Sequence, residues 1–221
     1  LISLVWEKTH LDKRLAIKSL CGIGTSMRQQ ITVWLVAATV LSIFLPNVVV
    51  VMILVPVAVS MLKFLGQENI TNNPIATPIL LALVWGAGFG GFGSPLGGAS
   101  NLVAISYLEK LTGQEFMYVD WIIRFIPLLF IILLFILAFL LRLPLPVDHL
   151  EGGKEYFRSV YAELGPMKKG EKLGLWLFAL ATILAFIRPL YVEYLSLMKP
   201  AYVFFFFGML TFVLRNESGQ L

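Results

Sequence analysis

The sequence predicts an all-α polytopic helical membrane protein with a re-entrant hairpin and a broken transmembrane helix. The mean hydropathy is +0.85, apolar residues make up 58% of the 221 positions and charged residues 14%, against about 25% in a typical soluble domain. The apolar residues fall into blocks separated by charged stretches, as in proteins that cross a bilayer several times. Two of these blocks are interrupted where a spanning helix would be continuous.

The first interrupted block, residues 31–62, carries no charged side chain and is divided at Pro46-Asn47. One spanning helix needs about 20 apolar residues, and two need about 40 plus a turn. Halved at the proline, the block gives two arms of about 15 residues, or roughly 22 Å each. We therefore expect a hairpin that enters the bilayer to mid-depth and returns, as in carriers and channels. A kink at Pro46 in one tilted helix is the alternative.

The second interrupted block, residues 75–111, is interpreted as a broken transmembrane helix. Seven glycines and one proline lie within residues 86–98. Relative to alanine in a helix, glycine costs about 1 kcal/mol and proline about 3 kcal/mol, so we expect this centre to be unwound. Ser100 is the expected N-cap of the second half. The alternative is that the glycines serve close packing against a neighbouring helix.

The remaining segments complete a multi-span topology. Residues 1–30 are basic with apolar residues between, which indicates interfacial arm helices whose basic side faces lipid headgroups. Residues 121–142 form an uninterrupted spanning helix, residues 143–172 a charged linker, and residues 173–215 two further spanning segments.

The distribution of Lys and Arg orients this topology. With a hairpin at 31–62, the stretches 1–30, 63–74 and 142–172 share one face and hold twelve basic residues, against three on the other face. By the positive-inside rule, residues 1–30, 63–74 and 143–172 are expected to be cytoplasmic, in a plasma or inner membrane. If 31–62 crossed the bilayer, the two basic stretches would lie on opposite sides.

Several other classes of protein are excluded by residue content. There are no paired carboxylates, nucleophile–base set or metal-ligand cluster, so we expect neither an enzyme nor a bound cofactor. The net charge of +4 is accounted for by the loops and the basic arm, so nucleic-acid binding is not expected. The chain begins at Leu1 without a signal peptide and stops soon after an apolar block. We expect it to be part of a longer protein.

The two interruptions supply the candidate site. Unwound backbone inside a bilayer is tolerated where it lines a cavity or is packed in protein, and two such breaks close in sequence suggest one shared cavity. Freed carbonyls there can bind a small cation, while helix N-termini attract an anion. Neither break contains Asp, Glu, Lys or Arg. The candidate ligands are the side chains of Ser42, Asn47, Ser94, Ser100 and Asn101, with backbone at Gly91, Gly93 and Gly97.

These segments resemble the divalent-anion:sodium symporters, the carriers of dicarboxylates, citrate and sulfate. LSIFLPNVVVVMILVPVAVSML is similar to their re-entrant hairpin, and GAGFGGFGSPLGGASNLVAI to their glycine-rich break, GG-x-x-T-P-x-G-x-x-x-N. HLDKRLAIKSL resembles the basic arm before the hairpin, and ELGPMKKGEKLGL the linker that opens the second repeat. The glycine motif is shared with related arsenite, citrate and proton/sodium antiporters, whereas the arm and linker narrow the choice.

The resemblance implies a fragment of a secondary carrier that covers most of the first inverted repeat, with residues 173–215 opening the second. It implies sodium-coupled movement of a small divalent anion by an elevator-type shift of residues 31–111 against a scaffold, with the full-length protein a homodimer. It implies substrate contacts at Asn47, Val48, Ser94 and Pro95, and a cation at Ser42, Pro46, Asn47, Gly93, Gly97 and Asn101. Proton coupling stays open.

One departure bears directly on that site. The family's hairpin tip is Ser-Asn-Thr, and this chain has Pro46-Asn47-Val48, without the two hydroxyls. Either the chain belongs to a divergent branch or the site is degenerate and does not transport; the retained Ser42 and Ser94 favour the first. An arsenite- or antiport-type carrier of the same superfamily is a further alternative. Such carriers tend to have an ionisable Asp at the tip.

Overall fold

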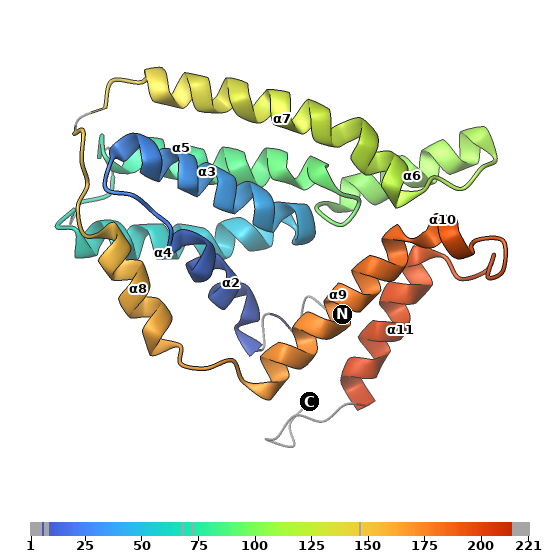
Figure 1. Cartoon of the computed structure of the whole chain (residues 1–221). Coiled ribbons are helices and arrows are strands. Elements are labelled where there is room, and N and C mark those ends of the chain that lie inside the picture. Colours follow the sequence, from blue (N-terminus) through green and yellow to red (C-terminus); the bar gives the residue numbers. More distant parts are fainter. Residues whose placement is uncertain (1–5, 7–8, 68, 72, 146, 214–221) are drawn as a thin grey trace.

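The computed structural model describes residues 6, 9–67, 69–71, 73–145 and 147–213, and every regular element within them is a helix (Figure 1). The prediction of an all-α protein is therefore confirmed. Among the described residues, four helices are long and apolar enough to cross a membrane, which supports a polytopic integral membrane protein.

The predicted hairpin is built from α3 (Met27–Phe44) and α4 (Asn47–Phe64), which turn back on each other in Figure 1. The break falls at Leu45, which is extended at φ −116° and ψ 147°, as expected for a residue that precedes a proline. Each arm has 18 residues, about 27 Å, and is longer than expected. The helices are longer than the apolar block because α3 begins with polar residues and α4 includes Lys63 near its end. The length of each arm is therefore compatible both with a re-entrant hairpin and with two helices that cross the bilayer.

The predicted broken helix consists of α5 (Ala76–Gly90), a single 3₁₀ turn η1 (Gly91–Gly93) and α6 (Ala99–Thr112). The break is therefore shorter than the expected 86–98, because helix continues through the first three glycines and the turn η1. The expected N-cap at Ser100 is wrong: Gly98 occupies the N-cap position, and α6 already includes Ser100.

Close packing explains why α5 tolerates glycine. A Cβ on Gly86 would lie 2.5 Å from the Leu35 carbonyl oxygen, and one on Gly90 would lie 2.6 Å from the Thr39 carbonyl oxygen. Both carbonyls belong to α3, the helix against which α5 packs most extensively. For these two glycines the packing interpretation holds, and the unwound interpretation applies only further along the chain.

A long helix, α7 (Tyr118–Arg142), runs back beside α5 (Figure 1) and contains the predicted span 121–142. Leu129 is the twelfth of its 25 residues and so lies near its middle. A Cβ on Gly93 would lie 2.6 Å from Ile43, at the end of α3, and 3.1 Å from Leu129. The end of α3 and the break after α5 therefore meet at the middle of α7.

The basic arm contains α2 (Leu11–Leu20), which packs against α8 (Gly153–Glu163) of the predicted linker. Lys13 and Lys18 are exposed, as a headgroup-facing side would require, but Arg14 is only 4% exposed. Its guanidinium donates to the Glu171 carboxylate at 3.0 Å and to two backbone carbonyls at the end of α8 at 2.8 and 2.9 Å. Arg14 thus connects the arm to the linker.

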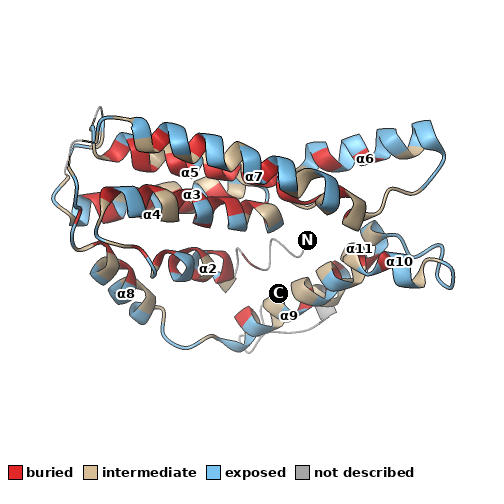
Figure 2. Cartoon of the chain, turned by 45° about the horizontal axis from the view of Figure 1, so that its top comes forward, coloured by how far each residue is buried: buried red, intermediate tan, exposed pale blue. Residues whose placement is uncertain are grey.

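The C-terminal part of the chain consists of α9 (Lys169–Phe186), the short α10 (Arg188–Tyr191) and α11 (Pro200–Val213). The helices α9 and α11 pack against each other, below and to the right of the α3–α4–α5–α7 group in Figure 1. Figure 2 shows that the buried residues concentrate where α3, α4 and α5 face one another, while α6 is mostly exposed.

Candidate functional site

Two serine side chains connect the hairpin to the broken helix. The Ser42 hydroxyl, near the end of α3, donates to the carbonyl of Ala87 in α5 at 2.6 Å. The Ser94 hydroxyl, in the break, donates to the carbonyl of Ile43. Both side chains are fully buried. The end of α3, just before the first break, is therefore in direct contact with the second break, and Ser42 bonds across the interface with α5 rather than within its own helix.

Asn101 holds the unwound segment in shape. Its side-chain amide donates to the Gly91 carbonyl at 2.7 Å and to the Ser94 carbonyl at 2.9 Å, and the residue is 4% exposed. Carbonyls that leave a helix inside an apolar environment need such donors, because an unpaired buried carbonyl is costly. The first turn of α6 therefore supports the end of α5 across the break.

Glycine at position 97 is required by close backbone approach. A Cβ there would lie 2.5 Å from both the Gly91 and the Ser42 carbonyl oxygens. The chain thus folds back until the segment 94–98 touches the end of α3. The Ser42 hydroxyl and carbonyl therefore lie close to the backbone of Gly91 and Gly97, so part of the oxygen set predicted for a cation lies in one small region, while Pro46 and Asn47 lie apart from it.

Trp121 belongs to this region and was not predicted. Its indole N–H donates to the Phe92 carbonyl at 2.9 Å, and its ring stacks on Phe125 at 4.2 Å between centroids. A buried tryptophan needs an acceptor, which is the only signal the sequence offers. Nothing in the sequence identifies the carbonyl that it reaches, 29 residues earlier.

The hairpin tip itself is more open. Pro46 and Val48 are exposed, Val48 by 65%, and Asn47 is half-buried. The Asn47 side-chain oxygen accepts the N–H of Val48 at 2.9 Å. Among the described residues its amide has no other hydrogen-bond partner. Asn47 is therefore not in hydrogen-bond contact with Ser42, Ser94 or Asn101, and its amide is available to a ligand.

Of the other predicted residues, Gly93 in η1 and Pro95 in the break are buried, whereas Ser100 in α6 is exposed. Pro95 lies within the turn in which the Leu96 N–H donates to the Ser94 hydroxyl at 3.1 Å. The structure thus gathers most of the predicted residues at the junction of hairpin and break, and leaves Ser100 apart.

The site contains oxygen atoms and helix ends, without ionised side chains. No Asp, Glu, Lys or Arg occurs from Ser42 to Val48 or from Gly91 to Asn101, and no group of metal-ligating His, Cys, Asp or Glu occurs in the described part of the chain. A hydroxyl that donates one hydrogen bond keeps lone pairs for a cation. The N-termini of α4 and α6, at Asn47 and Ala99, carry the positive ends of the helix dipoles. This arrangement suits a hard cation together with an anion.

Ser42→Ala should weaken the junction between hairpin and break. The change leaves the buried Ala87 carbonyl without its hydroxyl donor, which we expect to cost about 1–3 kcal/mol. Thermal unfolding of the detergent-solubilised protein, followed by circular dichroism, measures it. The control is Thr39→Val, since the Thr39 hydroxyl donates only within α3, to Leu35 at 2.7 Å. Equal losses in both variants would contradict a specific role for Ser42.

Known proteins are similar to this chain along most or all of its length. The chain matches the citrate transporter family over residues 1–219. A protein of Cupriavidus necator described only as a membrane protein is 32% identical over 187 residues, which are 80% of this chain and 36% of that protein. The sodium-dependent dicarboxylate transporter SdcS of Staphylococcus saprophyticus is 24% identical over 88% of this chain and 39% of its own length. SdcS of Staphylococcus aureus strain RF122 is 26% identical over 100% of this chain and 44% of its own length.

The chain spans less than half of the length of these curated relatives. The family match nevertheless includes the hairpin, the break and the junction between them. The matched family and the SdcS relatives are transporters rather than enzymes. This chain belongs to the citrate transporter family.

Proposed function

We propose that this chain forms the first-repeat part of a secondary carrier that moves a small divalent anion, such as a dicarboxylate or sulfate, together with sodium. The observation that carries the proposal is the junction in which Ser42 and Ser94 join the broken helix to the end of α3, just before the hairpin tip. Relatives named as sodium-dependent dicarboxylate transporters support the choice of ion and substrate class.

In this proposal the junction binds the cation first. Oxygen atoms of Ser42, Asn47 and the backbone near Gly93 and Gly97 would surround sodium, and Pro46 supplies a break without a side-chain oxygen. The carboxylate of the substrate then contacts Asn47 and Ser94 beside Val48 and Pro95. Since no arginine or lysine is present, the bound cation and the N-terminal dipoles of α4 and α6 offset the anionic charge. Sodium and substrate are therefore expected to bind cooperatively.

We also propose that α3 and α4 form a re-entrant hairpin. The support comes from how deep the end of α3 lies in the bilayer rather than from the length of the arms. The end of α3 lies close to Leu129, which is halfway along the spanning helix α7. The Lys/Arg distribution supports the same topology, with residues 1–30, 63–74 and 143–172 cytoplasmic.

The moving part in this proposal comprises α3, α4, α5 and α6. The helices α3, α4 and α5 pack against one another as one unit, and α6 follows α5 across the break, while α9 and α11 pack mainly on each other. An elevator-type displacement would shift the first group against the second, within a homodimer of the complete carrier. Residues 173–215 would begin the second repeat.

Transport is tested by reconstituting the full-length carrier that contains this chain in liposomes and measuring uptake of radiolabelled succinate, citrate and sulfate. We expect uptake of at least one anion under an inward sodium gradient, and little with choline in place of sodium. Uptake that follows a proton gradient without sodium would overturn the choice of coupling ion. No uptake of any of the three, by protein verified as folded, would overturn the carrier function and favour a degenerate relative.

Asn47→Ala should remove cation binding without unfolding the protein. The amide is half-buried and bonds only to the adjacent backbone, so its loss costs little stability. In the wild type, sodium at about 100 times its dissociation constant should stabilise by about 2.7 kcal/mol. Melting temperatures in sodium and in choline, with and without Asn47→Ala, measure the effect. An unchanged sodium response in the variant would exclude Asn47 from the site.

A further inference from the structure

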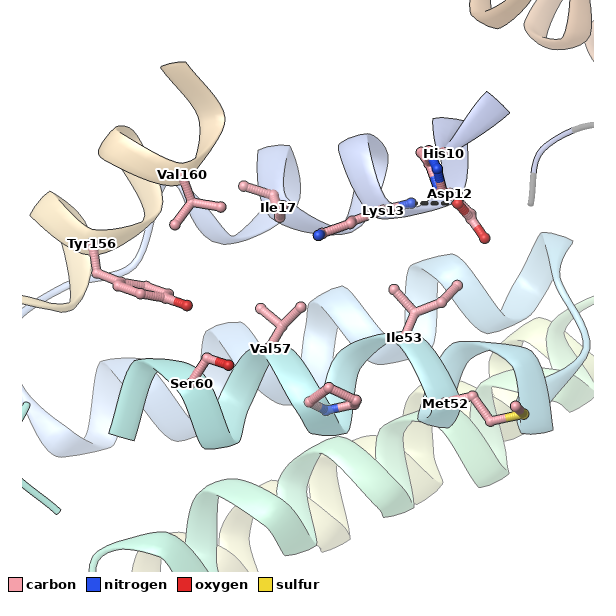
Figure 3. Close-up of a pocket in the computed structure, with 11 residues that line it drawn as sticks. His10, Asp12, Lys13, Ile17, Met52, Ile53, Val57, Ser60, Tyr156 and Val160 are labelled. Carbon is pink, nitrogen blue, oxygen red and sulfur yellow. Dashed lines mark hydrogen bonds between the residues drawn. The ribbon is translucent and has the colours of Figure 1, made fainter. Parts of the chain in front are cut away.

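A cavity outside the candidate transport site lies between α2, α4 and α8 (Figure 3). It is a groove of about 380 Å³. None of the residues that line it belongs to the candidate transport site. Two kinds of wall meet in it, one polar and one apolar, and this combination indicates an amphipathic occupant.

The polar wall brings together hydrogen-bond donors from three helices. In Figure 3 the Lys13 ammonium from α2, the Tyr156 hydroxyl from α8 and the Ser60 hydroxyl from α4 all point into the groove. Burial raises the pKa of the Tyr156 phenol, and interaction with Ser60 lowers it by less. The phenol therefore remains protonated at neutral pH and can donate. One ammonium and two hydroxyls are the groups that bind a phosphate or carboxylate oxygen.

The one carboxylate in the groove does not compete for this position. Asp12 is 6% exposed, and its side-chain oxygen accepts the N–H of Lys13 at 2.7 Å. In Figure 3 its carboxylate lies beside His10 at the opposite end of the groove, away from the Lys13 ammonium. The positive charge of Lys13 is thus directed toward Tyr156 and Ser60.

The apolar wall belongs to α4 and runs from Val57 through Ile53 to Met52, which is 71% exposed. From Ser60 to Met52 the helix rises about 12 Å, at 1.5 Å per residue, toward the hairpin tip. Ser60 and Tyr156 lie near the end of α4 that carries Lys63, on the predicted cytoplasmic side, and the Lys13 ammonium lies opposite Val57 (Figure 3). A polar end at the membrane surface and an apolar wall toward the bilayer centre reproduce the layout of a lipid.

We propose that this groove binds one anionic phospholipid, with its phosphate at Lys13, Ser60 and Tyr156 and an acyl chain along Val57, Ile53 and Met52. Basic pockets on the cytoplasmic side of membrane proteins attract anionic headgroups in this way. A soluble dicarboxylate would satisfy the donors but leave the apolar wall uncovered. The bound lipid would also bridge the arm helix α2 to the hairpin, whether or not the chain transports.

The test is native mass spectrometry of the detergent-solubilised chain with added phosphatidylglycerol or phosphatidylcholine. We expect one retained phosphatidylglycerol per chain and little phosphatidylcholine. Lys13→Gln should weaken retention about tenfold, the loss of one charge-assisted hydrogen bond. Lys18→Gln is the matched control, because Lys18 is exposed on the same helix and does not line the groove. Equal retention in both variants, or equal retention of both lipids, would overturn the proposal.

Two further measurements distinguish a lipid in this groove from a soluble anion and from lipid bound elsewhere on the surface. Glycerol phosphate in excess should not displace the lipid; displacement would assign the site to a soluble anion instead. In the wild type, phosphatidylglycerol with a photoreactive acyl chain should label the α4 segment from Met52 to Val57 more strongly than the lipid-facing Phe130 and Phe135 of α7. Labelling without preference for α4 would overturn the placement. This measurement uses the wild-type protein, so it does not depend on whether a variant folds.

Discussion

Replacing Gly90 by alanine is expected to force α3 and α5 apart and to destabilise the protein by about 3 kcal/mol, the upper part of the range for overpacking. The new Cβ would lie 2.6 Å from the carbonyl oxygen and 2.7 Å from the Cα of Thr39. Both are backbone atoms, so no side-chain rotation relieves the overlap. Because the new Cβ would also lie 3.1 Å from the Ser42 Cβ, the junction between α3 and the break should loosen as well.

Gly88→Ala provides the matched control, two residues earlier in the same helix. A Cβ there meets nothing within 4 Å, so the change should raise stability by up to about 1 kcal/mol through helix propensity. Thermal unfolding with and without sodium distinguishes the two variants. Gly90→Ala should lower the melting temperature and reduce the sodium-dependent shift, whereas Gly88→Ala should preserve both. Equal behaviour would show that α3 and α5 are not held in close backbone contact at Gly90.

These two glycines also mark how far the sequence can be interpreted alone. Composition, block lengths and the breaks at Pro46 and near Gly93 were sufficient to predict the helical membrane fold and its two interrupted elements. Propensity treats every glycine as a cost to the helix. It cannot separate a glycine that unwinds the chain from one that admits a neighbouring backbone, because that depends on which helix packs there. The helix therefore extends to Gly90, further than predicted.

The candidate site could be predicted from the sequence only in part. Polar residues in otherwise apolar segments must find partners, so Ser42, Ser94 and Asn101 could be chosen from their positions, and all three lie at the junction. Their partners are backbone carbonyls, which carry no residue-specific signal. Trp121 could not be assigned to Phe92 for that reason. The placement of Asn47 as a ligand remains a prediction.

Arg188→Ala is expected to destabilise the C-terminal part of the chain by about 3–5 kcal/mol, as for other buried charge pairs that lose one partner. The residue is fully buried and donates to both Glu115 oxygens at 2.7 and 2.8 Å. It also donates to the carbonyls of Leu195, Ser196 and Met198 at 3.0, 2.8 and 2.7 Å. One guanidinium therefore orders the loop before α11 and ties it to the segment between α6 and α7.

The geometry of these bonds gives the Arg188 prediction its controls. Lysine keeps the charge but lacks the planar fork that serves two carboxylate oxygens and three carbonyls at once, so Arg188→Lys should recover only a minority of the loss. Arg124→Ala removes an exposed arginine of α7, whose guanidinium lies 5.1 Å from the Phe116 ring centre, at a cost of about 0.5–1 kcal/mol. Hydrogen exchange should show faster exchange of residues 188–199 in Arg188→Ala alone. If those amides stayed protected, the loop would be ordered by packing, and the Arg188–Glu115 pair would be dispensable.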